Sequence, residues 1–313
     1  MKRNATDLQR LTTEKSNAAS ADLDRKSSLE IATIINAEDA KVAPAVQRAL
    51  PQIAQAIDLI AAALSHGGRL IYVGTGTSGR IGALDASEIP PTFDTSPRMV
   101  QFIIAGGTKA LATATEASED SRELGRKAMA KKKPGKNDVV LGMAASGRTP
   151  FTIAAVEFAR ARGAKTVAVT CNRNSRLGKA AHVEIVANVG PEVVAGSSRM
   201  KAGSAEKMIL NMLSTGAMTR LGYVYGNLMV NLHLKNTKLR ERGVSILEKT
   251  TDLDRTQATK LLASAGHSVP VALVMEKAGV TRAAATAALK KSRGHVRKAI
   301  ELAFPRDPPV LRG

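Results

Sequence analysis

Two kinds of hydrophobic pattern divide the chain. Residues 1–58 contain no strand-like run, and between residues 40 and 63 apolar positions recur every three or four residues, the spacing of an amphipathic helix. Polar residues at 20–24 are candidates to cap a helix that extends to Ile35. The pattern therefore predicts an N-terminal helical arm over residues 1–58.

From residue 59 the pattern changes. Helix-like segments, such as 149–162 and 175–181, alternate with short runs rich in β-branched residues. The runs lack strict alternation of polar and apolar positions, which is typical of parallel strands covered on both faces. Five of them occur, at residues 69–73, 99–104, 138–141, 166–170 and 183–187. We predict an α/β domain over residues 59–224, a doubly wound parallel five-stranded sheet.

The last third of the chain is helical in pattern. An amphipathic helix starts at Ser204, and its apolar side belongs in a core or a subunit interface; that side holds Met208, Ile209, Met212, Leu213 and Ala217. Beyond residue 226 short helical segments alternate with glycines, at 256–266, 268–279, 281–294 and 295–304. These predict a small bundle of three or four helices within a C-terminal helical domain, residues 225–313.

Composition narrows the function classes. The chain has no Trp, three Tyr and five Phe, so it lacks the aromatic platforms on which single-stranded nucleic acid stacks. Its net charge of +19 is spread along the chain, with dense patches at residues 126–136 and after residue 235. That charge either attracts nucleic acid or anionic metabolites, or forms an ordinary solvated surface, and we do not expect a nucleic-acid partner.

Cysteine and histidine usage gives no metal signature. Cys171 is the single cysteine, and the five histidines show no metal-binding spacing, so neither a disulfide nor a metal is expected. The first residues lack the apolar core of a signal peptide, and no apolar run reaches the length of about 18 residues that a membrane span needs. We expect a cytoplasmic protein without a membrane partner.

The stretch "GTGTSGR", residues 74–80, matches the glycine fingerprint of dinucleotide-binding proteins. Such proteins also need an acid at the end of the next strand to bind the ribose hydroxyls. That strand ends here in "IAGG", and Asp94, which has roughly the right count, precedes the strand. The loop therefore favours a smaller phosphate over NAD.

A second loop of the same kind, "AASGRTP", follows the third strand. Glycine amides, hydroxyls and a helix N-terminus can together hold a phosphate dianion without a metal. Neither loop has the sequence of a nucleotide-triphosphate P-loop. We predict a sugar-phosphate site whose binding residues are Thr75, Thr77, Ser78, Arg80, Ser146, Gly147, Arg148 and Thr149.

The two loops resemble those of sugar isomerase (SIS) domains. Several longer segments are similar to one SIS-domain family, the N-acetylmuramic acid 6-phosphate etherases: "GTGTSGRIGALDASEIPPTF", "EASEDS", "GMAASGRTPF" and "GSSRMKAGSAEKMILNMLSTGAM". "NAASADLD" and "YGNLMVNL" fit as well, so the resemblance covers nearly the whole chain. Proteins of the glucokinase-regulator type share part of these motifs.

The resemblance implies a cytoplasmic homodimeric lyase of peptidoglycan recycling and amino sugar catabolism. Such an enzyme uses water to release D-lactate from N-acetylmuramic acid 6-phosphate, leaves N-acetylglucosamine 6-phosphate, and needs no cofactor. By the same resemblance Glu88 and Glu119 are the acid and base, and either could take the C2 proton. From the residues alone, Glu119 could not be chosen over Glu116.

Glu88 is the better candidate for the acid. It is expected to end a short helix before Ile89-Pro90-Pro91, where the negative end of the helix dipole, with burial, would raise its pKa. A long continuous helix would instead place Glu88 far from loop 74–80. We therefore expect a short or bent helix, or a site completed by a second subunit.

The segment "GSSRMKAG" adds further candidates. Ser197 and Ser198 either bind sugar or cap the next helix. Arg199 and Lys201 could pair with the lactyl carboxylate, and His233 and Lys235 could reach a neighbouring subunit.

Two other functions use the same loops. One is a non-catalytic sugar-phosphate sensor with a basic helical C-terminus, although no helix-turn-helix is evident in residues 1–58. The other is an aldose–ketose isomerase with a single carboxylate base.

Overall fold

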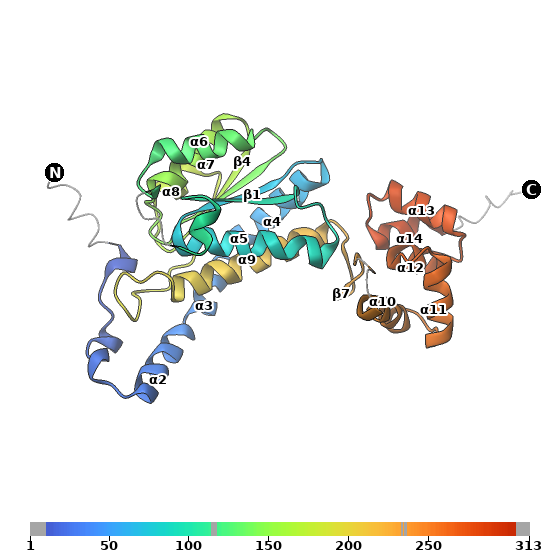
Figure 1. Ribbon diagram of the computed structural model, residues 1–313, viewed down its shortest axis with the longest axis horizontal. Helices are drawn as coiled ribbons and strands as arrows, with labels where there is room; N and C mark the ends of the chain where they lie inside the picture. The colour runs from blue at the N-terminus through green and yellow to red at the C-terminus, as the bar shows by residue number, and fades with distance from the viewer. Residues whose placement is uncertain (1–10, 114–117, 233, 235–236, 305–313) are drawn as a thin grey trace, which may run out of the picture. The chain divides into compact units, whose positions relative to one another are not determined.

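The computed structural model describes residues 11–113, 118–232, 234 and 237–304 (Figure 1). Its contacts divide the chain into two compact units, Met1–Ser87 with Pro97–Gly216 and Glu88–Ser96 with Ala217–Gly313. Helices α5 (Gly76–Phe93) and α9 (Lys201–Arg220) each contribute residues to both units. The three-part division expected from the sequence stays a prediction.

The first unit is built on a parallel sheet. Its strands lie in the order β2-β1-β3-β4-β5, and every neighbouring pair is parallel. The strands are β1 (Leu70–Gly74), β2 (Val100–Ile104), β3 (Val139–Met143), β4 (Lys165–Thr170) and β5 (Val183–Val186). Each lies within one residue or two of a run predicted from the sequence, so the predicted fold class is confirmed.

Helices cover both faces of this sheet (Figure 1). On one face lie α6 (Arg122–Lys132), α7 (Pro150–Ala161) and α8 (Arg176–Ala180). On the other lie α4 (Leu50–Ser65), α5 and α9. The short helix η4 (Thr108–Leu111) follows β2. Because helices exclude water from both faces, β1 and β3 consist entirely of buried residues.

The N-terminal arm begins differently from the expectation. Three short 3₁₀ helices, η1 (Thr12–Glu14), η2 (Ala18–Ser20) and η3 (Leu23–Arg25), precede α2 (Ser28–Asp39) and α3 (Val42–Gln47). Residues 20–24 therefore do not cap α2. Ser27 does, because its hydroxyl accepts from the N–H of Glu30 while the Glu30 carboxylate accepts from the N–H of Ser27, a reciprocal capping box.

Buried polar contacts hold the arm to the rest of the first unit. Ser20 Oγ donates to the carbonyl of Val193 at 2.7 Å. Deeper in the protein, Lys201 Nζ lies 2.5 Å from Glu38 Oε2, and both side chains are almost completely buried. The arm is thus tied to the segment that leads into α9.

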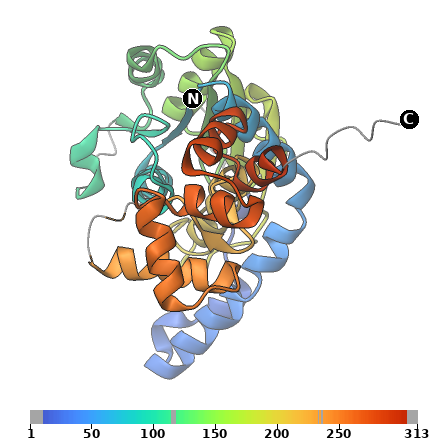
Figure 2. The same cartoon turned by 90° about the vertical axis from the view of Figure 1, so that its right-hand side faces the viewer.

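The second unit contains a small hairpin and a helical cluster. Strands β6 (Val224–Tyr225) and β7 (Leu228–Met229) pair antiparallel. The helices are α10 (Thr237–Thr250), α11 (Arg255–Ser264), α12 (Val269–Ala278), α13 (Arg282–Lys291) and α14 (Val296–Ala303), drawn from orange to red in Figure 2. Val230, Leu247, Leu262 and Leu273 belong to their common core.

Two details of this unit differ from the sequence analysis. Helix α10 was not among the predicted helices, and the hairpin was not expected at all; Gly226 allows it because its φ of 62° suits a tight turn. Within the described residues no single helix is long and apolar enough to cross a membrane, although α11 and α12, which meet at 109°, pass that test of length and composition when taken together.

Candidate functional site

The two glycine-containing loops leave the sheet side by side. Strand β1 has β2 on one side and β3 on the other, so the strand order reverses at this point. Gly74, the last residue of β1, pairs in register with Met143, the last residue of β3. Ligands of open α/β sheets bind outside the carboxyl ends of the strands at such a reversal.

Loop 1, residues 74–80, turns directly into α5. Its glycines permit a close approach of backbone: a Cβ at Gly74 would lie 2.8 Å from the nitrogen of Gly79, and one at Gly79 would lie 2.6 Å from Ile104 Cγ1. The N–H of Gly79 donates to the carbonyl of Thr75 at 3.0 Å, which closes the first turn. The remaining N–H groups of this helix N-terminus therefore lie at the carboxyl ends of the strands, as an anion site requires.

The hydroxyls of loop 1 lie in this first turn. Thr75 is buried, whereas Thr77 and Ser78 are half-buried. Ser78 Oγ is 2.8 Å from Glu206 Oε1, and Arg80 Nε donates to the carbonyl of Leu111 at 3.2 Å. The arrangement brings hydroxyl donors and the helix N-terminus to one place.

Loop 2, residues 146–149, leads into α7, whose first residue is Pro150. Gly147 has a φ of 66°, and a Cβ there would lie 2.3 Å from Ser175 Cβ, so no other residue fits this turn without movement. The N–H of Arg148 donates to Ser146 Oγ at 3.2 Å. The Thr149 side chain does not cap α7, although Thr149 occupies the N-cap position.

The end of β2 offers no ribose-binding acid. After Ile104 the chain turns through Ala105, Gly106 and Gly107, and both glycines have positive φ. Asp94 precedes β2.

Glu119 contacts elements of both loops. The N–H of Phe151, in the first turn of α7, donates to the carbonyl of Glu119 at 3.1 Å. A Cβ at Gly76 would lie 3.3 Å from Glu119 Oε1, so this half-buried carboxylate lies against the start of α5. Glu116, the alternative that the sequence left open, lies outside the described residues.

Glu88 does not end its helix. Helix α5 continues through Pro90 and Pro91 to Phe93, so the expectations of a short helix and of a carboxylate at its negative end were wrong. The side chain of Glu88 is exposed. Twelve residues separate it from Gly76, which corresponds to about 18 Å along a straight helix axis.

The segment before α9 completes the group of predicted residues. Ser197 and Ser198 are half-buried, and a Cβ at Gly203 would lie 3.4 Å from Thr77 Cγ2, so the first turn of α9 faces loop 1. The carboxylate of Glu192, rather than either serine, accepts from the N–H groups of Lys201 and Ala202, at 3.0 and 2.9 Å.

Arg199 and Lys201, two further candidates for substrate binding, differ in burial and in their partners. Arg199 is exposed. Lys201 already forms the buried ion pair with Glu38, so it does not have the free charge that pairing with a lactyl carboxylate would need. His233 and Lys235 lie outside the described residues.

Sequence reasoning missed two buried acids near the loops, Glu192 and Glu206. The signal for Glu206 was present: it lies four residues after Ala202 and three before Ile209, both buried, and so falls on the apolar side of α9. Glu192 could not be found in this way. It lies nine residues before Lys201, so the sequence pattern of an N-cap, which is local, does not predict that its carboxylate accepts from the start of α9. In the part of the chain that the structure describes, no cluster of three or more His, Cys, Asp or Glu side chains could hold a metal ion.

Comparison with known proteins places the chain among SIS-domain proteins. The model of the glucokinase regulatory protein N-terminal SIS domain matches residues 52–160, and that of the SIS domain matches residues 123–216. Among solved structures, a phosphoheptose isomerase from Neisseria gonorrhoeae is similar with a TM-score of 0.49 and 16% identity, over 62% of this chain and 100% of that one.

Three relatives share the name N-acetylmuramic acid 6-phosphate etherase. The protein from Clostridium beijerinckii is 48% identical, over 94% of this chain and 97% of the relative. The one from Klebsiella aerogenes is 49% identical, over 94% and 98%. The one from Symbiobacterium thermophilum is 54% identical, over 88% and 91%.

Proposed function

Since this chain belongs to the N-acetylmuramic acid 6-phosphate etherase family, it is a carbon–oxygen lyase, and we propose the course of its reaction from its loops and carboxylates. The substrate is N-acetylmuramic acid 6-phosphate, with its phosphate between loops 1 and 2. The products are N-acetylglucosamine 6-phosphate and D-lactate. This reaction belongs to the recycling of peptidoglycan.

The reaction runs through an unsaturated aldehyde. In the open-chain sugar the C1 aldehyde acidifies the proton on C2, and a carboxylate removes it. The lactyl oxygen leaves C3 with a proton from a carboxylic acid, which forms the C2–C3 double bond. Water then adds its hydroxyl to C3 and a proton returns to C2, so the sum is substrate plus water giving the two products. Each positioned proton transfer contributes typically about 10²–10⁴-fold.

The position of Glu119 carries this proposal. Its carboxylate lies against Gly76 in loop 1, and its backbone is bonded to the helix that loop 2 opens. A phosphate held by the two loops would bring the sugar carbons next to this carboxylate. The proposed binding partners of the phosphosugar are the hydroxyls of Thr75, Thr77, Ser78, Ser146 and Thr149, together with Arg80, Gly147, Arg148, Ser197 and Ser198.

The second carboxylate comes from another subunit. Only a few bonds separate the sugar C3 from the phosphate, whereas Glu88 lies about 18 Å along α5 from Gly76 of its own chain. We therefore propose a homodimer, in the cytoplasm, in which Glu88 of the partner subunit completes each site.

Incubation with N-acetylmuramic acid 6-phosphate in H₂¹⁸O and D₂O tests the function. We expect D-lactate without label, and N-acetylglucosamine 6-phosphate with ¹⁸O on C3 and deuterium on C2. An aldose–ketose isomerase would release no lactate, and a hydrolase acting at the lactyl carbon would place ¹⁸O in lactate. Either outcome would overturn the proposal.

A further inference from the structure

A buried acid contacts loop 1 and has no part in the reaction proposed above. Glu206 occupies the inner side of α9 and is 2% exposed. Its Oε1 lies 2.8 Å from Ser78 Oγ, in the first turn of α5. The one polar partner of Glu206 in the described residues is thus a hydroxyl of the proposed phosphate site.

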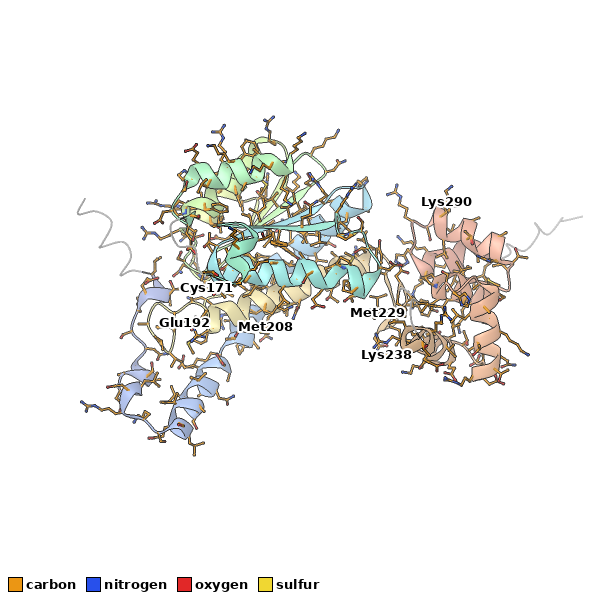
Figure 3. All side chains as sticks on the ribbon, viewed as in Figure 1. Cys171, Glu192, Met208, Met229, Lys238 and Lys290 are labelled. Carbon is orange, nitrogen blue, oxygen red and sulfur yellow. The ribbon has the colours of Figure 1, made fainter. Side chains whose placement is uncertain are left out.

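Among the described residues, no positively charged side chain is paired with Glu206. Cys171 follows the end of β4, Glu192 lies in the segment before α9 (both labelled in Figure 3), and both are buried. Burial, together with the charges of Glu206 and Glu192, raises the pKa of the Cys171 thiol. Lys201, five residues earlier on α9, pairs with Glu38 instead.

These surroundings keep the acid protonated. Burial raises the pKa of Glu206 to about 8, and the hydrogen bond with Ser78 offsets only part of this effect. With this pKa the Glu206 side chain is mainly a neutral carboxylic acid at neutral pH, and that form has an O–H to donate.

The protonation state decides what Ser78 can offer a ligand. A serine hydroxyl has one proton, and an ionised carboxylate can only accept. If Glu206 is ionised, its carboxylate accepts the hydrogen bond of the Ser78 O–H, and Ser78 then presents only lone pairs to a phosphate. If Glu206 is protonated, it can donate to Ser78 Oγ, and the proton of Ser78 is free to bind a phosphate oxygen.

We propose that Glu206 is a positioning residue for phosphosugar binding: its carboxylic acid donates to Ser78 so that Ser78 donates to the phosphate. This inference rests on the proposed function, because it assumes that loop 1 holds the phosphate. It predicts that phosphosugar affinity is full below the pKa of Glu206 and decreases above it. An ionised Glu206 would also repel the phosphate dianion directly.

The pH dependence of KM for N-acetylmuramic acid 6-phosphate tests the inference between pH 6.5 and 9.5, with kcat measured alongside. For the wild type, KM should be level up to about pH 8 and then rise, with a slope of at most about tenfold per pH unit. In Glu206→Gln the amide N–H donates to Ser78 at every pH, so KM should stay low and level across the range. In Glu206→Ala, which has no group to titrate at this position, KM should also lack this inflection.

Two controls separate the possible failures. Glu157→Gln, an exposed position on α7 paired with Arg122, should keep the wild-type profile. The affinity for N-acetylglucosamine 6-phosphate, measured by calorimetry over the same pH range, should show the same difference between wild type and Glu206→Gln. This measurement does not depend on turnover. Identical KM profiles for these two proteins, with lactate released, would overturn the inference alone, whereas absence of lactate at every pH would overturn the proposed function. If Glu206→Ala does not fold, the comparison of wild type with Glu206→Gln decides.

Discussion

The backbone N–H of Phe151 donates to the carbonyl of Glu119 over 3.1 Å. This bond fixes the segment that carries Glu119 to the first turn of α7, and therefore to loop 2. Because the Glu119 carboxylate also lies against Gly76 of loop 1, one residue is positioned by both loops. A carboxylate held in this way has a fixed position relative to any sugar whose phosphate the loops bind.

Replacing this carboxylate should remove proton transfer and leave binding intact. We expect Glu119→Gln to lower kcat for lactate release by about 10²–10⁴-fold, because an amide of the same shape cannot accept a proton. Calorimetry should show N-acetylglucosamine 6-phosphate binding within a few-fold of the wild type. The matched control is Glu123→Gln, an exposed position on α6 paired with Lys127, which should change neither quantity. Full turnover in Glu119→Gln would contradict the role of Glu119.

Loop 1 should tolerate no side chain at Gly79. A Cβ there would lie 2.6 Å from Ile104 Cγ1 and 2.9 Å from the carbonyl oxygen of Gly74, so either the helix start or the end of β2 must move. We expect Gly79→Ala to lower the free energy of unfolding by about 1–3 kcal/mol and to raise KM. Urea denaturation and steady-state kinetics measure the two effects.

The control for this substitution is Gly135→Ala, since a Cβ at Gly135 would have no atom within 4 Å. It should leave both KM and stability close to the wild type. A wild-type KM in Gly79→Ala would show that the close approach of α5 to the sheet is not needed for binding.

The buried pair of Glu38 and Lys201 should give the protein an acid-sensitive component of stability. Burial alone would raise the pKa of Glu38, but hydrogen bonds from Lys201 and Lys41 outweigh it and lower that pKa from 4.5 to about 2. A lowered pKa in the folded state stabilises the protein above the unfolded value of 4.5, by about 3 kcal/mol, and this contribution is lost as the pH falls toward 2.

Glu38→Gln should therefore lack this pH dependence. It should also be less stable at pH 7, by about 3–5 kcal/mol, because Lys201 would keep a buried charge without its partner. Denaturation curves from pH 7 to pH 2 for the wild type, Glu38→Gln and the exposed neighbour variant Asp39→Asn measure both effects. Parallel curves for the wild type and Glu38→Gln would contradict this account.

The sequence predicted the sheet well because its strands are buried on both faces and therefore form continuous apolar runs between polar turns. It also identified both loops, since glycine and hydroxyl residues directly follow two such runs. It did not predict the length of α5, because Pro90 and Pro91 each remove a helix N–H. The helix persists past them, with Ile89 and Phe93, one turn apart, both buried on its inner side.

Long-range contacts were not predictable from local patterns. The spacing of α9 places Glu206 on the apolar side, but nothing local indicates that Ser78, 128 residues earlier, lies opposite. In the same way, the choice of Glu119 over Glu116 came from family resemblance. The structure adds the contact of Glu119 with Gly76 and leaves its catalytic role a prediction.

The proposed sharing of sites between subunits makes a prediction that a single-chain site cannot meet. Glu88→Gln and Glu119→Gln homodimers should both be nearly inactive. When the two variants are co-expressed with different affinity tags and the mixed dimer is purified, one of its sites receives Glu119 from one subunit and Glu88 from the other. That dimer should recover about half of the wild-type turnover, because its second site lacks both carboxylates.

The reciprocal dimer provides the decisive control. A wild-type subunit paired with a Glu88→Gln/Glu119→Gln subunit has one carboxylate at each shared site, so it should be nearly inactive. If each site were built from one chain, the results would be reversed: the first mixed dimer would stay inactive and the second would retain about half of the activity, since its wild-type subunit would be complete. Lactate release from the two purified dimers, measured side by side, therefore distinguishes the arrangements. Both dimers carry the same two substitutions in total, and only the distribution of these substitutions between the subunits differs.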